Sequence, residues 1–250
     1  MNYFKQTFKY SRFFLLAGAV AFSASSCNTE TDDDDTTPTT PPTATPTIED
    51  GYGSLSAVKT VTFQDIPGFG QIEIDLGLAV GAFFNGTDYS SFVSAGTVSC
   101  EGSELTMNAN NSYTFTPSQT NATGIDFSGN PDWVVGGNGD IPAFTHTTNI
   151  GFPTTGAITS ASTVTAANGY TLSCANVAGA DSVLFMVGGV VATEMGNATS
   201  HTFTAADLAN VGTGSSVVQV AAYKIEEQIF SGKGFWFVNE RVVTQTVTLE

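Results

Sequence analysis

Hydrophobic and polar residues alternate along several stretches of the chain, which is the pattern of β-strands with one buried face. Residues 72–80 carry Ile, Leu or Val at every second position, and at residues 243–249 Val243, Gln245, Val247 and Leu249 alternate with threonines. Shorter runs with the same period occur at residues 98–100, 113–115, 170–174, 183–187 and 218–222. Only Phe203–Val211 favours a short helix, with Thr204 at the N-cap and Asp207 at capping-box spacing.

Strands of regular length separated by Gly- and Asn-rich turns predict an all-β fold of the sandwich type. About 200 residues follow Gly51, enough for two ordinary domains. A turn-forming break at Pro153-Thr154-Thr155-Gly156 divides them. We therefore expect one β-sandwich domain over residues 52–154 and a second over residues 155–250. A single merged sandwich is the alternative.

The C-terminal range resembles immunoglobulin-like domains. Thr171-Leu172-Ser173-Cys174 is similar to the strand that carries the first core cysteine of that family, and Ser216–Tyr223 occupies the place of its penultimate strand. Ala221 or Ala222 stands where the family has its second cysteine, and Phe185 is the nearest match to its core tryptophan. The resemblance implies an immunoglobulin-like β-sandwich and no particular activity.

The N-terminal residues have the composition of a secretory signal. Three basic residues, at positions 5, 9 and 12, precede the apolar run Phe13–Phe22 and the small residues Ser23–Ser26. The run is shorter than the roughly 20 residues that a membrane-spanning helix needs. Because the segment ends at Cys27, it resembles a bacterial lipoprotein signal, which implies removal of residues 1–26 and lipidation of Cys27. The alternative is an ordinary secreted protein cut near Ala24.

Residues 27–51 are rich in Thr, Pro and Asp and predict a disordered tether between the lipidated cysteine and the folded part. Four adjacent carboxylates, Asp32–Asp35, repel one another and keep the segment extended. An acidic block at this position resembles the export signal of surface-exposed lipoproteins of Bacteroidota. That resemblance implies an outer-membrane location facing the cell exterior; a tether without an address is the alternative.

The charge of the chain excludes several classes of function. Its formal net charge is −16, with seven Lys and Arg against 23 Asp and Glu. Three of the basic residues precede Cys27 and none of the acidic ones does, so the processed chain has four basic and 23 acidic side chains, a formal charge of −19. Nucleic acids bind through phosphate contacts to Lys and Arg, so we expect no nucleic-acid partner.

Few residues in this sequence have the spacing that catalysis requires. His146 and His201 are the only histidines, and neither lies in a zinc-ligand motif. No nucleophile elbow, phosphate-binding loop or C-x-x-C motif occurs. An enzymatic role would require one of the histidines to lie beside a carboxylate in a cleft. We therefore expect a non-catalytic protein without a cofactor.

Residues 126–146 contain the best candidate ligand site. Trp133 lies next to Asp132, and a glycine-rich loop follows with Asn138 and Asp140. Carbohydrate-binding sandwiches use an exposed aromatic ring against the sugar and nearby Asp or Asn for its hydroxyls. The same oxygens could hold calcium, although no EF-hand spacing is present. In the alternative interpretation, Trp133 packs in the core and the glycines form a wide turn.

Two cysteines remain after Cys27. Export permits a disulfide between Cys100 and Cys174, and two buried thiols are the equal alternative. Taken together, the sequence predicts a membrane-anchored surface lipoprotein that acts as a binding or adhesion module, with a glycan or a protein as its partner. A structural or assembly lipoprotein that partners an outer-membrane protein complex is the second hypothesis.

Overall fold

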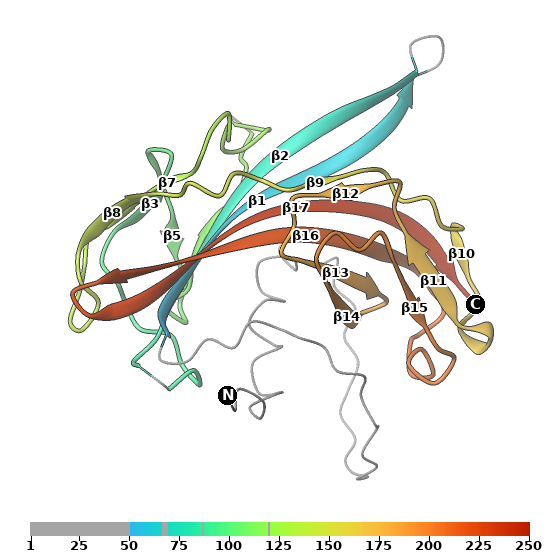
Figure 1. Ribbon diagram of the computed structural model, residues 1–250. Coiled ribbons are helices and arrows are strands. Elements are labelled where there is room, and N and C mark those ends of the chain that lie inside the picture. Colours follow the sequence, from blue (N-terminus) through green and yellow to red (C-terminus); the bar gives the residue numbers. More distant parts are fainter. Residues whose placement is uncertain (1–50, 67–69, 87, 120) are drawn as a thin grey trace.

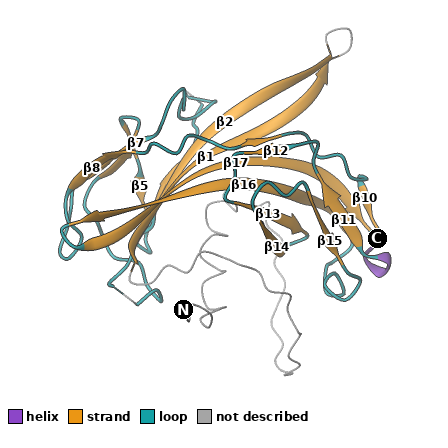
Figure 2. Cartoon of the chain, viewed as in Figure 1, coloured by secondary structure: helices purple, strands orange, loops and turns teal. Residues whose placement is uncertain are grey.

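The computed structural model describes residues 51–66, 70–86, 88–119 and 121–250, and the predicted all-β class is confirmed (Figures 1 and 2). The one helical element among these residues is a single 3-10 turn, η1, at Ala166–Asn168. Within the same residues, no helix has the length and apolar character needed to cross a bilayer. The leader, Cys27 and the tether lie outside the described residues, so the predictions made for them remain predictions.

Nine strands form one large sheet in the order β14-β13-β16-β17-β1-β2-β6-β5, with β10 also paired to β17. The strands of this main sheet are β1 (Gly51–Ile66), β2 (Gly70–Phe83), β5 (Thr106–Met107), β6 (Tyr113–Phe115), β10 (Thr163–Val164), β13 (Ser182–Val187), β14 (Val190–Met195), β16 (Gly214–Phe230) and β17 (Lys233–Leu249). Most neighbours are antiparallel, but β17 pairs in parallel with both β1 and β10.

Three smaller sheets accompany the main sheet: β4-β3-β7-β8, β11-β15 and β12-β9. Their strands are β3 (Val98–Cys100), β4 (Ser103–Glu104), β7 (Asp132–Val135), β8 (Phe144–Thr147), β9 (Thr154–Thr155), β11 (Tyr170–Ser173), β12 (Val177–Ala178) and β15 (Ser200–Phe203). The molecule therefore consists of a long sheet with short sheets packed against it, which is consistent with a sandwich architecture.

The β16–β17 hairpin runs the length of the molecule as an arch, and the segment with β9 and β12 lies along its outer side (Figure 1). Asn239 of β17 donates hydrogen bonds to the Thr148 hydroxyl at 3.3 Å and to the Gly151 carbonyl at 3.0 Å, which fix this connecting segment to the sheet. We call the side of the main sheet that Asn239 faces the convex face, and the opposite side the concave face.

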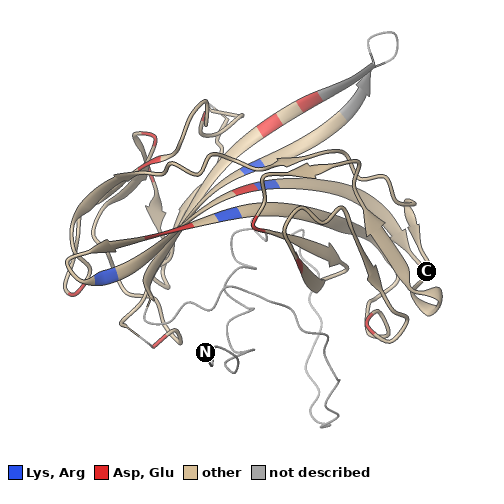
Figure 3. Ribbon diagram, in the orientation of Figure 1, with Lys and Arg blue, Asp and Glu red and all other residues tan. Residues whose placement is uncertain are grey.

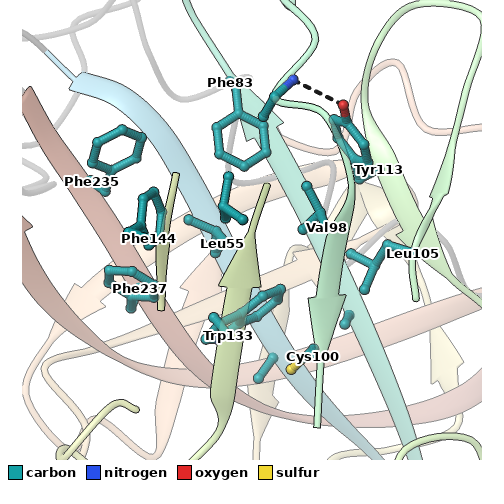
Figure 4. Close-up of a cluster of buried hydrophobic side chains, with 14 of the residues drawn as sticks. Leu55, Phe83, Val98, Cys100, Leu105, Tyr113, Trp133, Phe144, Phe235 and Phe237 are labelled. Carbon is teal, nitrogen blue, oxygen red and sulfur yellow. Dashed lines mark hydrogen bonds between the residues drawn. The ribbon is translucent and has the colours of Figure 1, made fainter. Parts of the chain in front are cut away.

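Two apolar cores lie on the convex face, one at each end of the arch. The first is enclosed by β3, β7 and β8 and includes Phe235 and Phe237 of β17 (Figure 4). The second is enclosed by β11 and β15 and includes Val247 and Leu249 of the same strand. Residues 235, 237, 247 and 249 are all odd-numbered positions of one uninterrupted strand, so they share one face of the sheet.

The predicted boundary at residue 154 does not separate two sheets. β1 and β2 come from the first predicted range, β13 to β17 from the second, and all of them belong to the main sheet. The two ranges are therefore not tandem sandwiches with independent sheets. Sequence alone missed this arrangement because the pairing of β1 with β17 joins the two ends of the described chain.

The second core contains the residues that carried the immunoglobulin resemblance. Cys174, Phe185 and Ala222 all belong to this cluster. β11, which carries the Thr171–Ser173 segment, pairs with β15, while β13 and β16 pair with each other in the main sheet. The class is all-β, and the immunoglobulin-like assignment stays a prediction.

The short helix expected at Phe203–Val211 does not form. Its capping box does: the Thr204 amide donates to the Asp207 carboxylate at 2.8 Å, and the Asp207 amide donates to the Thr204 hydroxyl at 3.2 Å. The following residues form consecutive turns instead of a helix. Leu208, buried in the second core, anchors these turns without requiring helical periodicity.

Candidate functional site

Trp133 is not a ligand platform. It is 0% exposed and lies within the first core, between the short β3-β7-β8 sheet and the main sheet (Figure 4). Strand β7 places Trp133 and Val135 inward and Val134 outward, as expected for a strand with one buried face. The predicted exposed aromatic ring is therefore wrong, and core packing is the interpretation that the structure supports.

The polar residues predicted to line the same site do not converge. Asp132 lies at the start of β7 and accepts a hydrogen bond from the Thr147 hydroxyl at 2.8 Å. Asn138 and Asp140 lie in the turn beyond the other end of that strand and are exposed. There, Asp140 forms an ion pair with Lys233 at 3.6 Å. No group of three or more His, Cys, Asp or Glu in the described part of the chain is placed to hold a metal ion.

The two cysteines of the folded part are free thiols, so of the two alternatives, a disulfide or two buried thiols, the structure shows the second. Cys100 belongs to the first core and Cys174 to the second, at opposite ends of the main sheet. Burial raises the pKa of both thiols above its ordinary value, which favours the neutral, unreactive form. Both cysteines act as small apolar side chains.

Each histidine lies beside a glutamate, and each pair joins a short sheet to the main sheet. The Nε2 atom of His146 on β8 is 2.9 Å from the Oε1 atom of Glu226 on β16. The Nδ1 atom of His201 on β15 is 2.7 Å from the Oε1 atom of Glu194 on β14. Aromatic rings flank both imidazoles, Phe237 at 4.4 Å from His146 among them. The pairs therefore link packed layers, and no hydroxyl or thiol of the described residues is hydrogen-bonded to either imidazole.

Glu226 holds its position through several donors. Its carboxylate also accepts hydrogen bonds from the Asn149 amide at 3.0 Å and from the Gln228 side chain at 2.8 Å. Burial alone would raise the pKa of Glu226, but these two donors and His146 outweigh burial and lower it below the ordinary value. Glu226 thereby fastens the connecting segment and β8 to β16.

We expect Glu226→Gln to lower the free energy of unfolding by about 2 kcal/mol at pH 7, since a charged acceptor with several donors is lost. Because the folded-state pKa is lowered, the stabilisation is present above the unfolded pKa and is lost as pH falls through the folded pKa. Urea denaturation at pH 7 and pH 3 measures both effects. A difference that stays the same at the two pH values would contradict this role.

The concave face of the main sheet carries a third apolar cluster, to which none of the smaller sheets contributes. The residues of this cluster come from six strands, and every one of those strands belongs to the main sheet itself. This cluster consists of Val58, Leu76, Leu78, Leu184, Met186, Val191, Ala221, Tyr223, Ile225, Val238 and Val242. Unlike the two cores on the convex face, this cluster includes no residue from any of the smaller sheets.

Charge is distributed unequally between the two faces of the main sheet. Figure 3 shows how few charged residues the sheet carries. All four basic side chains of the described residues lie on the convex face. Lys59 lies over the Phe152 ring, Lys224 donates to the Ile150 carbonyl, Lys233 pairs with Asp140, and Arg241 pairs with Glu73. The concave face carries no cation among the described residues.

Glu240 lies at the centre of the concave face. In the sheet it is placed between Tyr223 of β16 and Val58 of β1, with Val238 and Val242 on either side along β17. It is 6% exposed, and burial raises the pKa of its carboxyl to about 7. Sequence reasoning missed this residue, because the continuous run of buried residues at 235–240 hides its strand periodicity.

No protein-family model, curated protein or solved structure matches the chain. The geometry of the molecule is therefore the basis for its functional assignment.

Proposed function

We propose that this chain is a lipid-anchored, non-catalytic binding protein of the outer membrane, displayed outward, with the concave face as its binding surface. The binding role is supported by the composition of the concave face. This face carries a broad apolar cluster of the main sheet, with the Glu240 carboxylate at its centre and no cation among the described residues. None of the smaller sheets contributes to this cluster, and an apolar sheet face without a second sheet packed on it is a candidate interaction surface.

The anchor is supported by the sequence before Gly51. A basic head, a short apolar run and small residues end at Cys27, and the Asp-rich tether follows. More than one acyl chain on Cys27 would give durable attachment, because each buried methylene contributes about 0.8 kcal/mol. The tether would then hold the β-structure away from the membrane.

The buried position of Trp133 removes the residue on which glycan binding was predicted to depend. The concave face instead favours a protein partner, since an apolar cluster drawn from six strands lies on it. Of the two predicted roles, partnership with an outer-membrane protein complex is thus the better supported.

Mass spectrometry of the N-terminal peptide tests the anchor. We expect a peptide that begins at Cys27 and carries fatty acids, and Cys27→Ser should release the protein from the membrane fraction. Protease added to intact cells should degrade the wild-type protein if it faces outward. An unmodified N-terminus on a protein recovered from the culture fluid would contradict the proposal.

A further inference from the structure

We draw no further inference here: the strongest candidate, the apolar cluster that surrounds Glu240 on the concave face of the main sheet, belongs to the binding surface already described, and nothing in the described part of the chain shows what covers it.

Discussion

Trp133→Ala is expected to lower the free energy of unfolding by about 3–5 kcal/mol, since it removes a large side chain from a closed core. The residue is fully buried between two sheets, with Cys100 beside it on β3 and His146 beside it on β8. The surrounding strands belong to paired sheets and have little freedom to fill the space. Urea denaturation followed by circular dichroism gives the change directly.

Two further variants separate core packing from other roles of Trp133. Its indole Nε1 atom is buried and has no hydrogen-bond partner among the described residues, so Trp133→Phe loses no hydrogen bond and should cost less than about 2 kcal/mol. Val134→Ala, on the outward side of the same strand, should change stability by no more than about 0.5 kcal/mol. If Trp133→Ala were as mild as Val134→Ala, the core position of the ring would be refuted.

Glu240→Gln should stabilise the full chain at pH 8 by about 3 kcal/mol and change it little at pH 4.5. The folded-state pKa of about 7 lies above the ordinary value of 4.5, and each unit corresponds to about 1.4 kcal/mol. Because the pKa is raised, the folded state holds its proton longer than the unfolded state. Stability therefore falls as pH rises from 4.5 to 7, and a neutral glutamine avoids that loss.

Guanidinium denaturation of wild type and Glu240→Gln at pH 4.5 and pH 8 measures this difference. Glu104→Gln removes an exposed carboxylate and serves as the control, with changes within about 0.5 kcal/mol at both pH values. A stabilisation that is equal at the two pH values would show that the Glu240 carboxyl does not titrate in this range.

The sequence predicted individual strands well where one face is buried and the other is polar. The alternation at residues 72–80 lies within β2, and the alternation at 243–249 marks the end of β17. The length of β17 could not be predicted in the same way. Its residues 235–240 are buried on both sides of the sheet, by the first core on one side and within the concave face on the other, so no period of two is visible there.

The candidate site was harder to predict, because it depends on pairing between distant segments. Trp133 was placed correctly only by the alternative interpretation, in which strand alternation points it inward. The pairing of His146 with Glu226 joins residues 80 positions apart and has no local signal. Glu240 likewise gains its surroundings from Val58 and Tyr223, which belong to two other strands.

The parallel pairing of β1 with β17 governs the order in which the molecule can be assembled. During synthesis β1 emerges long before β17, so it lacks this neighbour until β17 has been made. A product cut short before Lys233 would lack that neighbour together with Phe235 and Phe237. A chain interrupted before β17 therefore cannot close its first core, so the topology allows only chains that include β17 to fold fully.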